Sequence, residues 1–164
     1  MKSKEIVPQL LLENQLCFAV YACSREITKL YQPYLDELGV TYSQYLVLMV
    51  LWEKEQCTVK ELGEALFLDS GTLTPLLKRL QAAGLINRER SAQDERKVII
   101  TLTDEGLRLK DRAKNVPGAM QNDVCMNGDE FSRLLNEFRS LLDRVHQINV
   151  QRDGKTAESK VKLT

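Results

Sequence analysis

The stretch "LDSGTLTPLLKRLQAAG" constrains the fold more than any other, because it combines the signals of a complete helix. Ser70 or Thr72 can cap its start, since a side-chain oxygen there accepts hydrogen bonds from the first free backbone N–H groups. Pro75 falls where early N–H groups lack partners in any case, and Gly84 supplies the stop. We therefore predict a helix over about residues 70–83 with a hydroxyl-rich N-terminus.

A predicted β-hairpin follows this helix directly. Its two β-prone runs, Leu85–Arg90 and Lys97–Thr103, flank a polar and charged loop. Short helices, then a helix with a polar N-terminus, then a two-stranded hairpin are typical of a winged helix-turn-helix. The sequence thus predicts a mainly α fold with a small β-hairpin wing.

Further helices are expected on both sides of this module. Residues 10–37 carry apolar side chains at intervals of three and four, which predicts one long helix, weakened and stopped from Pro33 onward. After residue 147 the chain is polar and unpatterned, so we expect disorder there. Capping signatures predict the other helix starts at Thr41 with Gln44, Thr58 with Glu61, Thr103, and Asn127 with Glu130.

The first and last helices carry apolar stripes that have no obvious partner within the module. Packing against a second copy would bury these stripes, which predicts a symmetric homodimer. The expected division is residues 1–40 as an N-terminal dimerisation helix, 41–103 as the winged helix-turn-helix, 104–147 as C-terminal dimerisation helices and 148–164 as a disordered tail.

One segment carries a local excess of basic side chains, and its position directly after a capped, hydroxyl-rich helix favours contact with double-stranded DNA, although charge alone does not decide. The net charge is zero, but residues 78–97 hold six basic and three acidic side chains. In this fold the wing can place Arg96 in the minor groove, with Asp94 setting its direction. The alternative is a solvated charged hairpin without a partner. The candidate DNA-binding residues are Ser70, Thr72, Thr74, Lys78, Arg79, Arg88, Arg90, Asp94 and Arg96.

Other features exclude several classes of protein. The sequence has no secretory signal and no apolar stretch near the ~20 residues that a membrane-spanning helix needs, so we expect a cytoplasmic protein without a membrane partner. Four cysteines in a reducing compartment are not a disulfide framework. They lack C-x-x-C spacing and His146 is the sole histidine, so we expect neither a metal nor a cofactor. Cys57 is interpreted as a loop or helix-end residue.

The stretch "ENQLCFAVYACSRE" places two cysteines six residues apart on the first predicted helix. Cys23 would point about 240° around the helix from Cys17, so the two cannot readily pair, and we interpret Cys23 as packing. Apolar neighbours favour an inert, packed Cys17 as well. Reactivity would require hydrogen-bond donors near its thiolate, for which Tyr21, Tyr31 and Tyr42 are candidates.

A family resemblance rests on several of these segments. "DERKVIITLTDEG" with "GLINRERS" resembles the wing of MarR-family transcription regulators, and Asp94 and Arg96 match the D-x-R pair of that wing. "LENQLCFAVYACSREITKLYQPYL", "GVTYSQYLVLMVLWE" and "LDSGTLTPLLKRLQAAGLI" narrow the resemblance to the OhrR branch, whose members sense organic hydroperoxides. It extends from about Leu12 to Gln147.

The resemblance implies a redox role for Cys17. In OhrR proteins the matching cysteine is the peroxidatic sensor, and tyrosines that correspond to Tyr31 and Tyr42 donate hydrogen bonds to it across the dimer interface. Its first oxidation product is a sulfenic acid. In some members an external thiol then reacts with this sulfenic acid, and in others a second cysteine of the partner subunit does so. Cys125 in "NDVCMNGDE" lies where this second cysteine is expected. The alternative is that Cys125 is a surface thiol without a role.

The expected function is therefore a homodimeric repressor, not an enzyme, which leaves its operator when an organic hydroperoxide oxidises Cys17. An intersubunit disulfide between Cys17 and Cys125 is the expected end product. Two alternatives stay open at this point. One is a regulator of the same fold that senses a small ligand in the dimer crevice, and the other is a thiol-dependent peroxidase whose basic hairpin is incidental.

Overall fold

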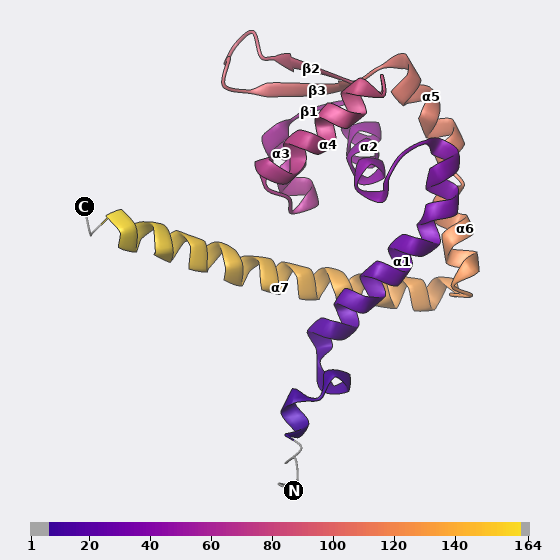
Figure 1. The fold of residues 1–164 in the computed structure, drawn as a ribbon, viewed down its shortest axis with the longest axis vertical. Helices are drawn as coiled ribbons and strands as arrows, with labels where there is room; N and C mark the ends of the chain where they lie inside the picture. The colour runs from indigo at the N-terminus through magenta and orange to yellow at the C-terminus, as the bar shows by residue number, and fades with distance from the viewer. Residues whose placement is uncertain (1–6, 162–164) are drawn as a thin grey trace, which may run out of the picture. The chain divides into compact units, whose positions relative to one another are not determined.

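The computed structural model describes residues 7–161 of the chain, with side chains as far as residue 153. The chain forms two compact units, residues 1–117 and 118–164, which are described separately (Figure 1). The elements are 3-10 turns at Pro8–Leu10 and Leu12–Asn14, then α1 Leu16–Leu38, α2 Tyr42–Lys54, β1 Gln56–Thr58, α3 Val59–Leu66, α4 Ser70–Ala82, β2 Ile86–Arg90, β3 Val98–Leu102, α5 Asp104–Ala113, α6 Val116–Asp123 and α7 Gly128–Val161. No helix in this described part is long and apolar enough to cross a membrane.

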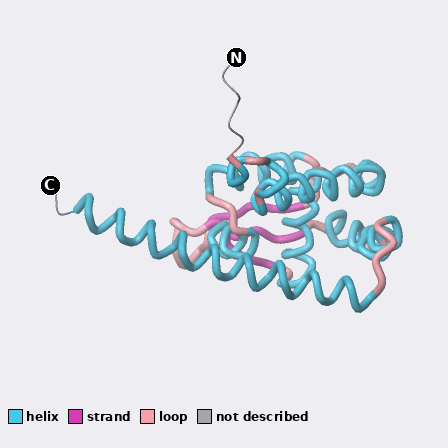
Figure 2. The backbone as a smooth tube through the Cα atoms, turned by 90° about the horizontal axis from the view of Figure 1, so that it is seen from below, coloured by secondary structure: helices cyan, strands magenta, loops and turns pink. Residues whose placement is uncertain are grey.

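The first unit contains a winged helix-turn-helix, which confirms the predicted fold class. Strands β2 and β3 form the expected antiparallel hairpin, and it projects past α3 and α4 (Figure 1). A third strand, β1, pairs with the other side of β3, so β3 is central in the sheet drawn in magenta in Figure 2. Beneath the sheet, leucines of α2, α3 and α4 are fully buried: Leu48, Leu51, Leu62, Leu73, Leu77 and Leu80.

The strand β1 corrects the interpretation of Cys57 as a loop or helix-end residue. Cys57 lies opposite Ile100 in the sheet and is only 4% exposed. A strand of three residues is too short to show an alternating pattern, and it lies between the end of α2 and the cap of α3. Its sequence therefore looked like a connection.

The capping boxes predicted at Thr41 and Thr58 are present. The Thr41 hydroxyl oxygen accepts from the Gln44 backbone N–H at 3.4 Å, while the Gln44 side-chain oxygen accepts from the Thr41 N–H at 2.8 Å. Thr58 and Glu61 repeat the arrangement at 3.2 and 2.7 Å. These reciprocal bonds satisfy donors that every helix start leaves open, which fixes where α2 and α3 begin.

The first helix starts later than predicted. Residues 10–15 form turns instead, because the Asn14 amide donates to the Pro8 carbonyl at 2.9 Å and the Gln15 amide donates to the Gln9 carbonyl at 2.7 Å. Such side-chain bonds compete with the helical backbone for the same acceptors. The helix α1 then continues through Pro33 and ends at Gly39, whose φ of 70° gives the left-handed stop.

The cap of α4 is Asp69, not Ser70 or Thr72. Its carboxylate accepts from the Thr72 N–H at 3.0 Å and from the Thr72 hydroxyl at 2.8 Å. Pro75 is consequently the sixth residue of the helix rather than part of its first turn. Gly84, with φ 72°, ends the helix as predicted.

The last helix extends beyond the predicted boundary. Asn127 caps α7 by accepting from the Glu130 N–H at 2.9 Å. The helix continues to Val161, whereas we expected disorder from residue 148; residues 162–164 lie outside the described part. An established helix gains one backbone hydrogen bond for each added residue, so a polar segment without proline can extend it.

Candidate functional sites: a basic face and an exposed cysteine

The start of α4 presents three hydroxyl groups, but they are not equivalent. Thr72 donates its hydroxyl proton to Asp69, and Thr74 donates its own to the Ser70 carbonyl at 2.7 Å. Among these three described side chains, only the Ser70 hydroxyl makes no hydrogen bond within the chain. Ser70 is therefore the one that can donate to a phosphate without breaking an existing bond.

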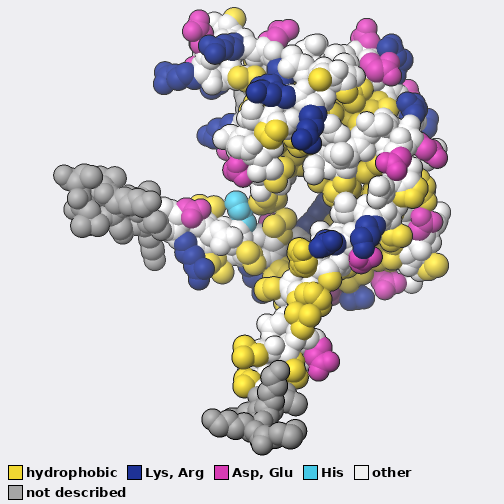
Figure 3. All heavy atoms as spheres, viewed as in Figure 1, with side chains coloured by type: hydrophobic (Ala, Val, Ile, Leu, Met, Phe, Trp, Pro, Cys, Tyr) yellow, Lys and Arg dark blue, Asp and Glu magenta, His cyan; other side chains and the backbone are white. Residues whose placement is uncertain are grey.

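Basic side chains continue from α4 into the wing. Lys78 and Arg79 are exposed on α4, and Arg90 is exposed on β2. Arg88 is half-buried, and its Nε atom is buried without a hydrogen-bond partner among the described residues. Figure 3 shows Lys, Arg and acidic side chains together where Figure 1 places the hairpin. The patch is therefore mixed in sign and does not form a uniformly basic surface.

The end of the wing is organised around Asp94. Its carboxylate accepts from the Arg96 backbone N–H at 3.1 Å and lies 3.6 Å from Arg96 Nε. The Arg96 side chain is 96% exposed. Exposed ion pairs of this kind add little stability.

Three cysteines are exposed and one is buried. Cys17 is the second residue of α1 and is exposed, as are its neighbours Leu16 and Phe18. The expectation that Cys23 packs is wrong for the single chain, because Cys23 is exposed too. The prediction that Cys23 packs rested on the apolar stripe of α1. In the single chain, no other described segment covers Cys23 on that helix.

The other two cysteines lie in different surroundings. Burial raises the pKa of the Cys57 thiol to about 11, with the nearby Glu61 carboxylate adding to the shift and Lys54 opposing it. Cys57 therefore stays protonated and unreactive near neutral pH. Cys125 is exposed between α6 and α7, at a left-handed backbone position with φ 54°.

The structure brings two of the predicted tyrosines together and adds a third. The rings of Tyr31 and Tyr42 are 5.0 Å apart, and the ring of Tyr45 is 6.2 Å from Tyr31. Burial raises the pKa of all three phenols, which keeps them protonated as hydrogen-bond donors. Sequence analysis missed Tyr45, although its position three residues after Tyr42 places both on one face of a helix.

Tyr21 lies apart from that cluster. Its hydroxyl oxygen accepts from Arg25 at 2.9 Å, and the Arg25 guanidinium lies 5.6 Å from the centre of its ring. Tyr21 follows Cys17 by one helical turn on α1, and no hydrogen bond between the two is present. In the single chain Tyr21 is therefore partnered by Arg25 rather than by the thiol.

Cys17 and its predicted tyrosine partners do not meet within one chain. Cys17 and Tyr31 belong to the same helix, fourteen residues apart. At 1.5 Å per residue this spacing corresponds to about 21 Å along the axis, far beyond hydrogen-bond range. A second chain must supply the phenols if they are to contact Cys17.

Two helices carry uncovered apolar side chains. On α1 they are Leu16, Phe18, Tyr21, Ile27 and Leu30; on α7 they are Phe131, Phe138, Leu142, Val145, Ile148 and Val150. At 100° per residue, Leu16, Ile27 and Leu30 share one face of α1, whereas Phe18 and Tyr21 lie on its other side. On α7, Phe131, Phe138, Leu142 and Val145 share one face, which is more than scattered surface hydrophobicity. The α7 face corresponds to the stripe from which a homodimer was predicted, and on α1 the correspondence is limited to Leu16, Ile27 and Leu30.

Comparisons with known proteins agree with the winged-helix fold, because the chain is similar to transcriptional regulators. The sequence model of the family described as transcriptional regulator SarA/Rot matches residues 29–113. The organic hydroperoxide resistance transcriptional regulator of Bacillus subtilis (strain 168) is 52% identical over 138 residues, covering 84% of this chain and 94% of that protein.

Solved structures of AbfR, a protein of Staphylococcus epidermidis, are similar as well. Reduced AbfR bound to DNA shares 40% identity at a TM-score of 0.70, over 84% of this chain and 96% of that one. Disulfide-formed AbfR shares 40% identity at a TM-score of 0.55, over 82% and 95% of the two chains. The chain therefore belongs to the MarR and SarA/Rot family of winged-helix transcriptional regulators, in the branch of the organic hydroperoxide regulators.

Proposed function

We propose that this protein is a homodimeric repressor that binds a DNA operator while Cys17 is reduced and leaves it when an organic hydroperoxide oxidises Cys17. The observation that carries the proposal is the separation of the sensor into two parts. Cys17 is exposed at one end of α1, while the protonated phenols Tyr31 and Tyr42 lie together near the other end. The relative in Bacillus subtilis, an organic hydroperoxide resistance regulator, supports the choice of effector.

The dimer follows from the uncovered apolar faces. Residues 1–40 and 104–147 provide the interface, since α1 and α7 expose apolar side chains at helical spacing. Burying apolar surface contributes about 25 cal/mol for each Å², so two such faces give a strong driving force for association. In a two-fold arrangement, Tyr31 and Tyr42 of one subunit donate hydrogen bonds to Cys17 of the other.

The sensing reaction begins with the Cys17 thiolate, which donors stabilise. Its sulfur attacks the terminal oxygen of the hydroperoxide, the O–O bond breaks, and the departing alkoxide takes a proton to become an alcohol. The sulfur is oxidised by two electrons to sulfenic acid. The Cys125 thiol of the partner then attacks this sulfur, forming the S–S bond and releasing water.

The exposure of Cys125 supports this second step. A resolving thiol must be reachable, and Cys125 lies in the exposed turn between two helices. AbfR supplies a parallel, because its disulfide form is a solved structure. This chain resembles the reduced, DNA-bound form of AbfR more closely than the disulfide form, at TM-scores of 0.70 and 0.55, which supports a change of shape on disulfide formation.

The DNA contacts are assigned to residues 41–103, on α4 and on the wing that follows it. The start of α4 enters the major groove, where Ser70 donates to a phosphate and Lys78 and Arg79 reach phosphates or purine edges. Thr72 and Thr74, whose protons are engaged, act as acceptors. Arg88 and Arg90 of β2 contact the backbone, and Arg96, directed by Asp94, enters the minor groove.

The test is operator binding before and after cumene hydroperoxide, with a DNA fragment selected by the reduced protein. Wild type should lose affinity on oxidation, whereas Cys17→Ser should keep its affinity. Cys23→Ser is the matched control, because Cys23 is an exposed cysteine on the same helix, and it should behave as wild type. Release by peroxide in Cys17→Ser would refute the sensor role.

The resolving step has its own readout on non-reducing gels. Cys125→Ser should stop at sulfenic acid, detectable with dimedone, and should form no intersubunit disulfide. If the same disulfide-linked dimer forms without Cys125, the two-cysteine mechanism is wrong. Continuous consumption of peroxide in the presence of a thiol donor would instead favour the peroxidase alternative.

A second candidate is a regulator of the same fold that senses a small ligand, as an open, mostly apolar depression of about 290 Å³ favours. Its lining includes Tyr45, Met49 and Trp52 together with Lys110 and Lys114. This candidate predicts that an added ligand changes operator affinity equally in wild type and Cys17→Ser. Equal insensitivity of both proteins to peroxide would favour it over the redox sensor.

A further inference from the structure

We infer that Trp52 is a positioning residue that couples the Tyr31–Tyr42 pair to the end of α4 and the start of the wing. The inference rests on the proposed function, because it concerns how oxidation at Cys17 reaches the DNA-binding elements. Two sets of contacts meet at Trp52. One is a row of aromatic rings, and the other is a chain of hydrogen bonds.

The aromatic row follows one face of α2. Tyr42, Tyr45 and Trp52 lie at positions i, i+3 and i+10 of that helix, so their side chains share a face. The ring centre of Tyr45 is 6.2 Å from that of Tyr31, with the two rings tilted. It is 5.9 Å from the ring centre of Trp52, and this pair is edge-on. Tyr45 is 3% exposed. Because protein interiors are close-packed, the Tyr31–Tyr42 pair cannot rearrange without displacing Tyr45, and Tyr45 in turn contacts Trp52.

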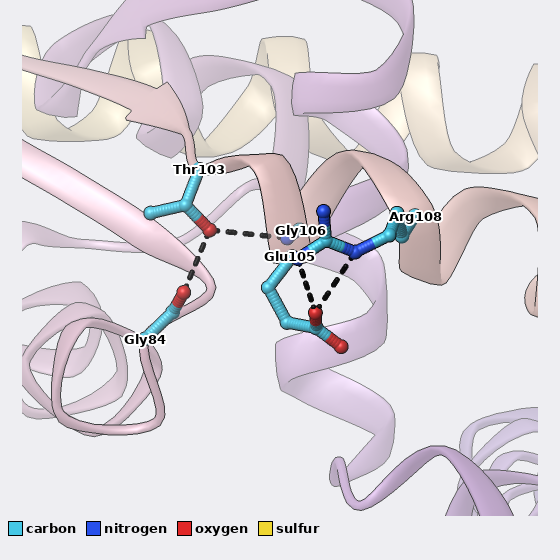
Figure 4. Close-up of polar contacts among 5 residues, drawn as sticks. All are labelled: Gly84, Thr103, Glu105, Gly106 and Arg108. Atoms are coloured by element: carbon cyan, nitrogen blue, oxygen red, sulfur yellow. Dashed lines mark hydrogen bonds and ion pairs between the residues drawn. The ribbon is translucent and has the colours of Figure 1, made fainter.

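The hydrogen-bond chain leads from Trp52 to α4. The indole Nε1–H donates to the Gly106 carbonyl at 2.9 Å. The Gly106 N–H donates to the Thr103 hydroxyl oxygen at 3.1 Å, and that hydroxyl donates its proton to the Gly84 carbonyl at 2.6 Å. Figure 4 shows Thr103 between these two glycines. Gly84 lies two residues beyond the last residue of α4, in the left-handed turn that ends that helix, so the hydrogen-bond chain reaches the C-terminal end of α4, the proposed recognition helix.

Two further contacts make this junction tight. A Cβ atom on Gly106 would lie 2.2 Å from the Leu85 carbonyl oxygen, so the start of α5 rests directly on the backbone that leads into β2. The Lys110 ammonium also donates to the Trp52 carbonyl at 3.0 Å, which ties α5 to the end of α2 a second time. A displacement of Trp52 must therefore move the segment between α4 and the wing.

The coupling operates through the phenols. In the reduced dimer they donate to the Cys17 thiolate, and oxidation replaces that acceptor with a sulfenic acid or disulfide. The rings then adopt a second arrangement, and Tyr45 and Trp52 follow. The spacing of the two recognition helices changes because each is tied at Gly84 to this network. Operator affinity falls as the dimer population shifts to that geometry.

The test compares three variants by the ratio of operator Kd after and before cumene hydroperoxide, with dimedone labelling of Cys17 in the same samples. Trp52→Phe keeps a ring but removes the donor to Gly106, and Thr103→Val removes the hydroxyl between Gly106 and Gly84. In both variants Cys17 should label with dimedone as in wild type. The ratio of operator Kd after and before peroxide should nevertheless be at least about fivefold smaller than in wild type, since about fivefold is the lower end of typical coupling between two sites. Thr103→Ser restores the hydroxyl and should restore the ratio.

The outcomes separate the inference from the function on which it rests. If wild type labels but keeps its operator, the proposed function fails. If wild type releases DNA and Trp52→Phe keeps the full wild-type ratio, the coupling role of Trp52 is wrong. Should Thr103→Val fold poorly because α5 loses its cap, Trp52→Phe decides alone, since the cap is intact there.

A spectroscopic readout is available in the unmodified protein. Trp52 is the single tryptophan of the chain, so its emission reports on this site alone. We expect peroxide to shift or quench the emission in wild type but not in Cys17→Ser. Unchanged emission in fully sulfenylated or disulfide-linked protein would contradict the inference.

Discussion

At the scale of single residues, chemistry in this protein depends on where the chain places identical side chains. Cys57 faces the core between β1 and β3, whereas Cys17, Cys23 and Cys125 face outward. Nothing in the sequence distinguished Cys57 from the other cysteines, because a three-residue strand has no periodicity. The sensor cysteine was recognisable only through its family context, since its apolar neighbours alone favoured packing.

Cys57 should remain unmodified in the folded protein over a wide pH range. With its pKa raised to about 11, the thiolate is scarce near neutral pH, and burial excludes reagent. Pulse alkylation followed by mass spectrometry should label Cys57 only in denaturant, with exposed Cys125 as the reference thiol. Labelling of Cys57 in native protein at a rate like that of Cys125 would contradict its buried state.

The same shift has a consequence for stability. When the pKa of a thiol is higher in the folded state than in the unfolded state, the unfolded chain loses its proton at a lower pH. The free energy of unfolding therefore falls as pH rises between the two pKa values. The contribution of Cys57 is thus complete below about pH 9, the ordinary value, and is lost as pH rises toward about 11. A Cys57→Ala variant should show less decline in melting temperature over that interval than wild type.

At the scale of elements, local signals predicted most of the fold. Capping depends on residues three apart, so Thr41–Gln44 and Thr58–Glu61 were identifiable from sequence. The cap of α4 was predicted wrongly because Asp69, Ser70 and Thr72 are all competent caps, and only the backbone decides among them. The length of α7 was missed because polar composition does not distinguish an extended helix from a disordered tail.

Two glycines in helices should respond in opposite ways to alanine. At Gly106 the added Cβ would collide with the Leu85 backbone, so Gly106→Ala should lower the free energy of unfolding by about 1–3 kcal/mol. At Gly118 nothing lies within 4 Å of that Cβ, and Gly118→Ala should gain up to about 1 kcal/mol of helix propensity. Urea unfolding measures the change in the free energy of unfolding for each variant. If Gly106→Ala changes it by the same amount as Gly118→Ala, α5 does not approach the Leu85 backbone as closely as the structure describes.

At the scale of the whole molecule, the exposed apolar faces make a single chain incomplete. Sequence periodicity predicted these faces, and the structure finds them uncovered in the described chain. The predicted helix over residues 10–37 already implied that Cys17 and Tyr31 lie far apart along its axis. Sequence alone left open that Tyr42, on the next helix, lies beside Tyr31, because this contact depends on how α1 and α2 pack.

A charge on the apolar face of α7 should disrupt the dimer. Phe138→Glu places a carboxylate in the face that contains Leu142 and Val145, and burying an unpaired charge is costly. Sedimentation velocity should show monomers, and operator affinity should fall steeply. Ser140→Glu is the matched control, because it adds the same charge about 200° around the helix and should stay dimeric. A dimeric Phe138→Glu would exclude this face from the interface.

The distance between Cys17 and Tyr31 on one helix also has a genetic meaning. Under the proposed assembly each dimer holds two sensors, and each sensor is a thiol from one gene product beside phenols from the other. A chain without the thiol, such as Cys17→Ser, and a chain without the phenol, such as Tyr31→Phe, therefore carry complementary lesions. In their mixed dimer one sensor has both lesions and the other has neither, so two defective alleles together rebuild one intact peroxide sensor.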